Sequence, residues 1–171
     1  LQKGHTYYTS NSGVLELREE ICRYLDRRFS IKYDPKTETL ITVGGSEAID
    51  LTIRAVIESG DEVLIPEPCF VCYAPITTLA GGTPVPIVTR AEDDFKLTPE
   101  LLKAAITPKT KLLILPFPNN PTGAIMTKED LEAIAEVLDG TDIAVLSDEI
   151  YAELTYGTHH VSIASIPSMY E

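Results

Sequence analysis

Apolar and polar positions along the chain follow two periods in turn, one typical of helices and one of strands. Between residues 14 and 29 apolar side chains recur every three or four positions, which predicts an amphipathic helix. Short apolar runs predict strands at 39–43, 62–65, 84–88, 111–115 and 143–146. Further helices are predicted over 70–80, 98–106 and 127–138, and another carries Ile49, Ile53, Val56 and Ile57 on one face.

This alternation of strands and helices predicts the class of fold. The runs at 111–115 and 143–146 are continuously apolar, as expected of parallel strands that are covered on both faces. Strands joined by helices form right-handed crossovers. We therefore expect an α/β fold: a doubly wound, mainly parallel sheet with helices on both faces. In such sheets ligands bind at the carboxyl ends of the strands.

Charge and composition narrow the range of partners. The 171 residues include 26 acidic and 14 basic side chains, a net charge of −12, which opposes binding to nucleic acid or to anionic membrane surfaces. No apolar run reaches the ~18 residues that span a bilayer, and the N-terminus has no apolar signal core. We expect a cytoplasmic protein of one domain, or of one domain with part of a second.

Neither the cysteines nor the histidines predict a metal site. Cys69 and Cys72 have the spacing of a redox or metal pair, but no second pair completes it, so two buried structural thiols are favoured. The adjacent residues His159 and His160 would point to opposite faces of an extended segment, and a surface loop is favoured there.

Polar and glycine-rich segments follow four of the predicted strands. Gly44, Gly45 and Ser46 precede a helix and would form an anion-binding turn or an ordinary helix cap. They match neither the dinucleotide-binding glycine pattern nor a Walker loop. The other segments are 66–70, 116–123 and 147–151. All four would meet at one crevice.

Four residues of these segments could serve a bound ring. Asp148 directly follows a fully apolar strand, where a carboxylate needs a partner that is cationic or carries a proton. The alternative is that Asp148 caps the segment after it. Tyr151 would share its crevice. Asn120 is a turn former or a fixed amide donor, and Phe70 is core or a stacking surface. Together they fit a flat, phosphorylated heteroaromatic cofactor, for which pyridoxal 5'-phosphate (PLP) is the natural candidate.

Two motifs carry a resemblance to a known family. The segment PNNPTG at 118–123, followed by SDEIY at 147–151, resembles the class I/II PLP-dependent aminotransferases of the aspartate aminotransferase superfamily (fold-type I). The resemblance runs from about Tyr8 to the C-terminus. Within it, GGSEAID at 44–50 and PEP at 66–68 resemble most the bacterial N-acetyl-diaminopimelate and aspartate aminotransferases.

The resemblance implies a role for each matching position. The residues implied to bind the cofactor are Gly45, Ser46 and Glu47 at its phosphate, Phe70 against its ring, Asn120 and Tyr151 at its phenolic oxygen, Asp148 at its pyridine nitrogen, and Tyr8 at the phosphate of a neighbouring subunit. The last role implies a homodimer, with amino acids and 2-oxo acids as substrates. No metal ligand and no catalytic residue is implied within the chain.

One element of the family pattern is missing. The Ser-x-x-Lys whose lysine forms the Schiff base lies downstream of the segment that matches 147–151, and none of the lysines here stands in that context. We therefore expect 1–171 to be an incomplete cofactor-binding large domain, with residues 1–35 near the domain junction and the small domain absent. Such a piece would leave its last strand as an open edge, be marginally stable or oligomerise, and be inactive alone.

Three functions stay open at this point. The first is a PLP-dependent aminotransferase in amino-acid metabolism, with this chain as a fragment of it. The second is a PLP-dependent carbon–sulfur lyase or decarboxylase of the same fold, because residues that hold the ring do not select the reaction. The third is a non-catalytic truncated remnant.

Overall fold

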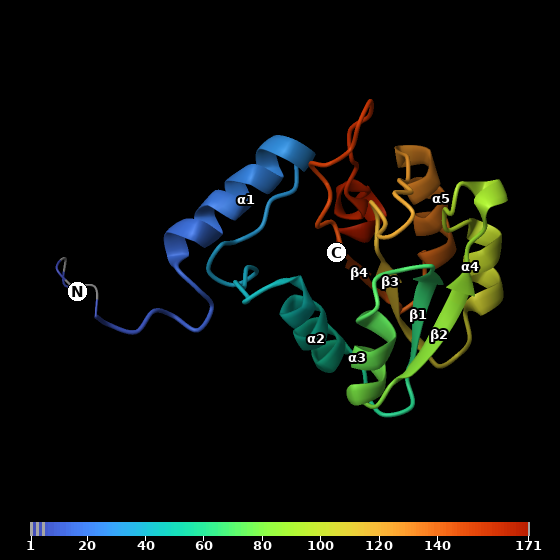
Figure 1. Cartoon of the computed structure of the whole chain (residues 1–171), viewed down its shortest axis with the longest axis horizontal. Coiled ribbons are helices and arrows are strands. Elements are labelled where there is room, and N and C mark those ends of the chain that lie inside the picture. The colour runs from blue at the N-terminus through green and yellow to red at the C-terminus, as the bar shows by residue number, and fades with distance from the viewer. Residues whose placement is uncertain (1, 3, 5, 171) are drawn as a thin grey trace. The chain divides into compact units, whose positions relative to one another are not determined.

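The computed structural model describes residues 2, 4 and 6–170 and divides into two compact units, Leu1–Gly44 and Gly45–Glu171. Figure 1 shows the elements of both. In the first unit, helix α1 (Leu15–Phe29) follows the predicted amphipathic pattern and ends at Ser30, whose backbone is left-handed with φ 60°. Within this unit Arg18 is buried, and its guanidinium donates to the carbonyl oxygen of Pro35 at 2.7 Å.

The predicted strand at 39–43 is wrong. In the part of the chain that the structure describes, these residues belong to no strand, and Val43 is exposed. The backbone N–H of Ile41 donates to the carbonyl oxygen of Ser12 at 3.1 Å, but no ladder develops from this contact. A β-prone sequence forms a strand only where a neighbouring strand pairs with its backbone groups.

The second unit contains the predicted parallel sheet. Its strands are β1 (Glu62–Glu67), β2 (Thr83–Val88), β3 (Thr110–Leu115) and β4 (Ala144–Ser147). Their order is β2-β1-β3-β4, and all neighbouring pairs are parallel. Strand β1 continues through Pro66, where a stop was expected. Its pairing with β3 ends at Leu64, so the missing N–H of Pro66 interrupts no bond on that side.

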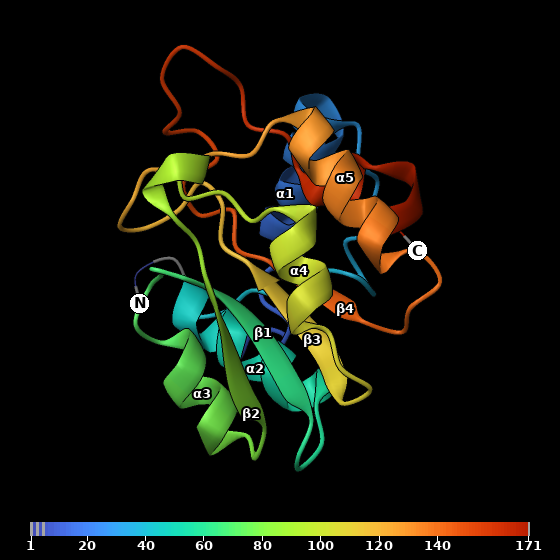
Figure 2. The ribbon, with the colours of Figure 1, turned by 90° about the vertical axis from the view of Figure 1, so that its right-hand side faces the viewer.

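Helices cover both faces of the sheet, as predicted. They are α2 (Gly45–Val56), α3 (Tyr73–Leu79), α4 (Pro99–Ala105) and α5 (Lys128–Leu138), with short 3-10 helices η1 (Ala91–Asp93), η2 (Ile163–Ser165) and η3 (Pro167–Met169). Figures 1 and 2 show α2 and α3 on one side of the sheet and α4 and α5 on the other. Alternate strand residues divide between the two cores: Ile65 and Ile114 pack towards α2, whereas Leu64 and Leu113 pack towards α4 and α5.

The two edge strands differ in their chemistry. The N–H groups of Thr83, at the start of β2, and of Thr89, just after its end, donate to carbonyl oxygens on the β1 side. Backbone N–H groups alternate in direction along a strand, so those at positions 84 and 86 would point to the open edge, and both positions are proline. Proline there leaves no donor for a further strand. Strand β4 has no proline and pairs only with β3 among the described strands. The expectation that the last strand is an open edge is met within this part of the chain.

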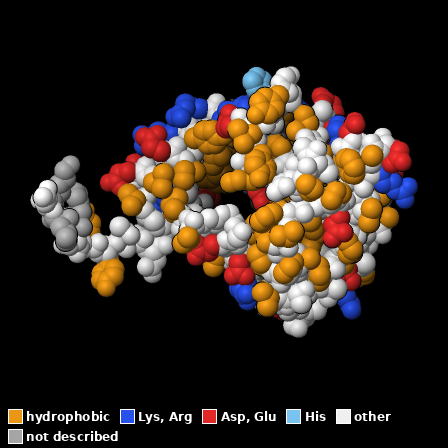
Figure 3. Space-filling view, viewed as in Figure 1, with side chains coloured by type: hydrophobic (Ala, Val, Ile, Leu, Met, Phe, Trp, Pro, Cys, Tyr) orange, Lys and Arg blue, Asp and Glu red, His pale blue; other side chains and the backbone are white. Residues whose placement is uncertain are grey.

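Charged side chains of both signs lie on the surface. On the face shown in Figure 3, Lys and Arg side chains lie singly among acidic and uncharged ones. None of the described helices combines the length and apolar character that crossing a membrane requires.

One buried hydroxyl predicts a stabilising substitution. Thr77 on α3 is fully buried, and its Oγ1 has no hydrogen-bond partner among the described residues. Valine has the same shape without the polar atom, so Thr77→Val is expected to raise the free energy of unfolding by about 1 kcal/mol. Urea unfolding would measure the change. The control is Thr78→Val, because Thr78 is exposed and donates to the carbonyl of Ala74; equal effects of the two substitutions would refute the explanation.

A charge at the start of α5 predicts a dependence of stability on pH. Asp130 completes a capping box with Thr127, and Lys96 Nζ lies 2.7 Å from its Oδ2. Partial burial raises the pKa of Asp130, but the Lys96 ammonium and the Thr127 hydrogen bonds outweigh it and lower the pKa below 3.8. The carboxylate therefore stabilises the fold fully above its unfolded-state pKa, and this contribution is lost as pH falls through the lowered folded-state value.

Asp130→Asn tests this charge, because the amide can still cap the helix. At neutral pH the variant is expected to unfold about 0.5–1 kcal/mol more easily than the parent. The difference should shrink in acid, below about pH 4. Thermal unfolding of both proteins across this range would measure it, and a difference independent of pH would contradict the role of the charge.

Candidate functional site

A cavity of about 200 Å³ lies at the carboxyl ends of the strands, where the sequence predicts a ligand. We call it the main cavity. Its walls come from α2, from the β1–α3 connection, from the segment after β3 and from the segment after β4. The residues that line it are Gly45, Ser46, Ile49, Phe70, Tyr73, Pro116, Pro118, Asn120, Asp148, Ile150 and Tyr151. Six of the eight predicted cofactor residues therefore surround one space.

The first turn of α2 forms one end of the cavity. Helix α2 begins at Gly45 and runs for 12 residues, so its first N–H groups have no partner within the helix and carry the positive end of its dipole. An ideal Cβ built on Gly44 or Gly45 would meet no atom within 4 Å, which leaves the backbone open to a ligand. Ser46 adds a hydroxyl. This end of the cavity suits an anion such as a phosphate.

Asp148 lies on the cavity wall with a partner from a distant part of the chain. Tyr73 Oη donates to Asp148 Oδ2 at 2.8 Å, and the N–H of Ile150 donates to Oδ1 at 3.2 Å. Burial raises the pKa of the Tyr73 phenol above its usual range, and the hydrogen bond to Asp148 and its negative charge raise it further. Tyr73 therefore remains a neutral donor at neutral pH. Two roles were considered for Asp148, partner of a proton-bearing group and cap of the next segment. Its side chain has both, since it accepts from the Tyr73 hydroxyl and from the N–H of Ile150 in its own turn.

Sequence reasoning missed Tyr73. The residue is three positions after Phe70, and the two rings meet edge to face with centroids 6.1 Å apart. Its phenol hydroxyl reaches a carboxylate 75 residues further along the chain. The only signal in the sequence was the predicted helix over 70–80, on which Phe70 and Tyr73 would share a face. Helix α3 in fact begins at Tyr73, so Phe70 stands in the loop before it.

Two neighbouring asparagines in the turn after β3 have different roles. Asn119 is buried; its Oδ1 accepts from the Thr122 hydroxyl at 2.8 Å, and its carbonyl accepts from the N–H of Gly123 at 2.9 Å. Gly123 has φ +73°, which favours glycine. Asn119 thus forms the turn, and Asn120 beside it is exposed and lines the main cavity. Of the two roles considered for Asn120, its position favours the amide donor.

A second cavity, the side cavity, adjoins the first. It has a volume of about 430 Å³ and shares Pro118, Asn120 and Tyr151 with the main cavity. Its other lining residues include Leu154, Thr155 and Tyr156 from the segment after Tyr151. None of the residues that line either cavity is a lysine or an arginine. Asp148 is the one acidic side chain among these lining residues.

Two predicted cofactor residues do not line the main cavity. Glu47 lies in the first turn of α2 with an exposed side chain. Tyr8 belongs to the unit Leu1–Gly44 and is fully exposed there. Their implied roles at a phosphate stay predictions.

The thiols near the main cavity are unsuited to nucleophilic chemistry. Cys69 and Cys72 are free and half-buried, less buried than expected, and pack against the core under α2 and α3. Burial, followed by the charge of Glu67, raises the pKa of Cys69 to about 11. Burial also raises the pKa of Cys72, although Ser46 opposes this shift. Both thiols are therefore protonated at neutral pH.

No metal centre emerges from the described residues, in which no group of three or more His, Cys, Asp or Glu side chains could hold an ion. The two adjacent histidines differ in exposure. His159 is exposed as expected, but the expectation of a surface position is wrong for His160. Only 7% of its side chain is exposed, and its Nε2 lies 3.1 Å from Glu149 Oε2.

Comparison with known proteins links this site to one family. The family model described as aminotransferase class I and II matches residues 1–169. Over 160 residues the chain is 46% identical to a Bacillus subtilis protein named "Probable N-acetyl-LL-diaminopimelate aminotransferase", covering 94% of this chain and 40% of that protein. Over 172 residues it is 44% identical to the aspartate aminotransferase of Pyrococcus abyssi, covering 100% of this chain and 44% of the relative.

Solved structures agree in fold. The crystal structure of an aromatic aminotransferase from Pyrococcus horikoshii superimposes with a TM-score of 0.95 at 46% identity, over 99% of this chain and 46% of that one. The chain thus spans less than half the length of the relatives that it matches.

Proposed function

The chain belongs to the class I and II aminotransferase family, and from this we propose that it is part of an enzyme that transfers an amino group between an amino acid and a 2-oxo acid. Members of this family depend on PLP. One observation carries the proposal: Ser46, Phe70, Asn120, Asp148 and Tyr151, from four separate segments, line a single cavity. The relatives compared above are named aminotransferases, which favours amino transfer over carbon–sulfur lysis, decarboxylation or a non-catalytic role.

The donor set of the main cavity fits PLP. The open backbone at Gly45 and the hydroxyl of Ser46 suit a dianionic phosphate. Phe70 offers an aromatic face to a flat ring. The single carboxylate, Asp148, suits a ring nitrogen that carries a proton. The amide of Asn120 and the hydroxyl of Tyr151 are hydrogen-bond donors, which suit a phenolate oxygen.

In the proposed mechanism each residue has one task. When bound, PLP supplies an electron-withdrawing ring that accepts the electrons of the substrate Cα–H bond. Asp148 would keep the proton on the ring nitrogen, and Tyr73 holds the Asp148 carboxylate in place through its 2.8 Å hydrogen bond. The first turn of α2 anchors the phosphate, while Phe70 orients the ring. Asn120 and Tyr151 would hold the phenolic oxygen.

The proposal extends beyond the described site. We propose that 1–171 is a partial cofactor-binding large domain with residues 1–35 near its junction with a small domain. The Schiff-base lysine would then come from another part of a longer protein. Tyr8 and Glu47 are proposed to contribute at the phosphate, Tyr8 to the site of a second subunit in a homodimer. A cytoplasmic location is part of the same proposal.

The test is an assay of the full-length protein loaded with PLP. Amino acids are supplied with pyruvate or another 2-oxo acid, and both the new amino acid and the new 2-oxo acid are quantified. Equal amounts of the two products are expected. Release of a thiol amino acid and ammonia from cystathionine, with no amino group transferred to the supplied 2-oxo acid, would overturn amino transfer in favour of the lyase. Failure to bind PLP would overturn the proposal altogether.

A further inference from the structure

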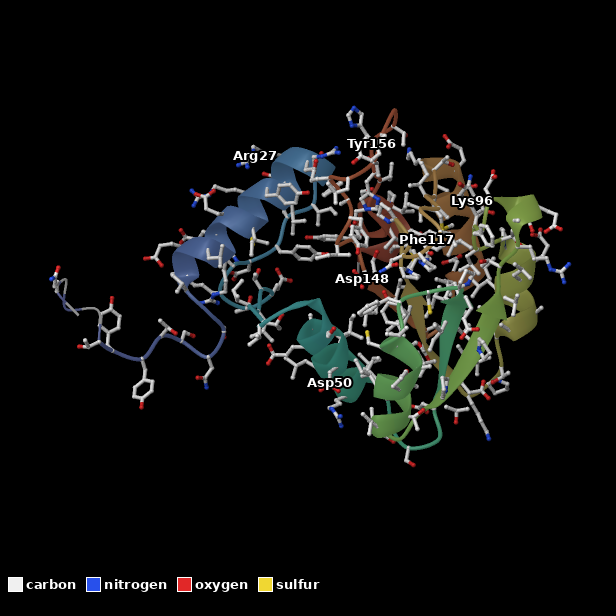
Figure 4. The ribbon with its side chains drawn as sticks, viewed as in Figure 1. Arg27, Asp50, Lys96, Phe117, Asp148 and Tyr156 are labelled. Atoms are coloured by element: carbon white, nitrogen blue, oxygen red, sulfur yellow. The ribbon has the colours of Figure 1, made fainter. Side chains whose placement is uncertain are left out.

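The segment 148–162, which joins β4 to η2, contains no helix or strand and contributes to both cavities. Asp148 and Tyr151 stand near its start. Figure 4 shows Tyr156 on its outer part, away from Asp148. A segment of this length without regular structure is expected to be mobile unless its ends are held together. Tyr151 can partner a cofactor only if its position is fixed.

The side chain of Glu149 joins the two ends of this segment. Its Oε1 accepts hydrogen bonds from the hydroxyls of Ser147 and Ser162, both at 2.8 Å. Its Oε2 lies 3.1 Å from Nε2 of His160. We call these four residues the clasp. Ser147 ends β4, whereas His160 and Ser162 stand at the far end of the segment, so the Glu149 carboxylate binds a hydroxyl 13 positions further along the chain.

Burial explains why the clasp can hold. Only 19% of the Glu149 side chain and 7% of that of His160 are exposed. A carboxylate withdrawn from water needs polar partners, and opening the segment would remove the Ser162 hydroxyl and the His160 side chain from Glu149. Glu149 also begins the turn that carries Tyr151, because the N–H of Ala152 donates to the Glu149 carbonyl at 2.9 Å. The clasp therefore includes the residue next to Asp148, which is also the first residue of the turn that contains Tyr151.

We propose that Glu149 and His160 are positioning residues, which close the segment 148–162 and thereby hold the Tyr151 hydroxyl at the wall of the main cavity. Neither residue lines that cavity, so neither is proposed to touch the cofactor. The inference rests on the proposed function, because it takes the bound group to be PLP and Tyr151 to be its partner.

The experiment is a double-mutant cycle in the full-length protein, read by the dissociation constant of PLP from the apoenzyme. His160→Leu is expected to weaken PLP binding about tenfold. Tyr151→Phe should weaken it by a similar factor. In the Tyr151→Phe background, His160→Leu should add less than about twofold, because the hydroxyl that the clasp positions is already gone. Thermal unfolding of each variant separates these effects from loss of the fold.

Matched variants sharpen the test. His159→Leu changes the exposed neighbour of His160 and is expected to leave PLP binding unchanged. His160→Gln keeps a polar side chain that can contact the Glu149 carboxylate and should recover most of the affinity. If His160→Leu does not fold, Ser162→Ala takes its place, since it removes the hydroxyl that joins the far end of the segment to Glu149 Oε1, and the same pattern in the cycle is expected.

Each result decides between the two proposals. If the unmodified protein fails to bind PLP, the proposed function is overturned, and the clasp inference with it. If it binds PLP but His160→Leu has the same effect with and without the Tyr151 hydroxyl, the clasp is only a stabilising contact and the inference is overturned alone. An unchanged dissociation constant in Tyr151→Phe overturns the inference in the same way.

Discussion

Replacing Asp148 by Asn is expected to lower the kcat of the full-length enzyme by a factor of about 10²–10³. In the variant the amide oxygen can accept from the N–H of Ile150 and the amide NH₂ can donate to Tyr73 Oη, so a contact with each partner can persist. It loses the negative charge that stabilises a protonated ring nitrogen. Steady-state kinetics with a saturating amino acid and 2-oxo acid would measure the change.

The control for this prediction is Asp50→Asn. Asp50 lies on α2 but pairs with Arg54 at 3.0 Å on the exposed side of the helix. Its removal is expected to change kcat by less than about twofold, since exposed ion pairs contribute little. A similar loss of kcat in both variants would point to a general effect of negative charge. A near-normal kcat in Asp148→Asn would contradict the assigned role of Asp148.

Replacing Leu113 by Ala is expected to cost about 2–5 kcal/mol of unfolding free energy in the apoenzyme. Leu113 is fully buried in β3, which pairs with strands on both sides, and it packs in the core under α4 and α5. Because both neighbouring strands hold the backbone of residue 113, the surrounding core has little freedom to fill the space that the lost side-chain atoms leave. The cost should therefore lie in the upper half of this range. The change in the midpoint of urea unfolding measures it.

Leu79→Ala is the matched control, because Leu79 ends α3 with 73% of its side chain exposed. Its effect is expected to stay within about 0.5 kcal/mol. A cost below about 1 kcal/mol for Leu113→Ala would show that the core can repack around the lost atoms, contrary to its position in the centre of the sheet.

The sequence by itself determined the order and type of most elements. The apolar runs that became β3 and β4 read directly as buried parallel strands, and Thr127 with Asp130 predicted the start of α5, because these signals are local. The same rules placed Ser46, Phe70, Asn120, Asp148 and Tyr151 at the ends of strands. Since parallel strands end at one edge of a sheet, their meeting at one cavity could be predicted without coordinates.

Only the tertiary structure decided what depends on a distant partner. The run at 39–43 is apolar enough for a strand, but among the described residues no neighbour pairs with it. The hydrogen bond from Tyr73 to Asp148 spans 75 residues, and the contact between Glu149 and His160 forms only because the segment between them folds back. Periodicity shows which face of an element is buried. It does not show which polar side chains from separate elements meet, because that depends on how the elements pack.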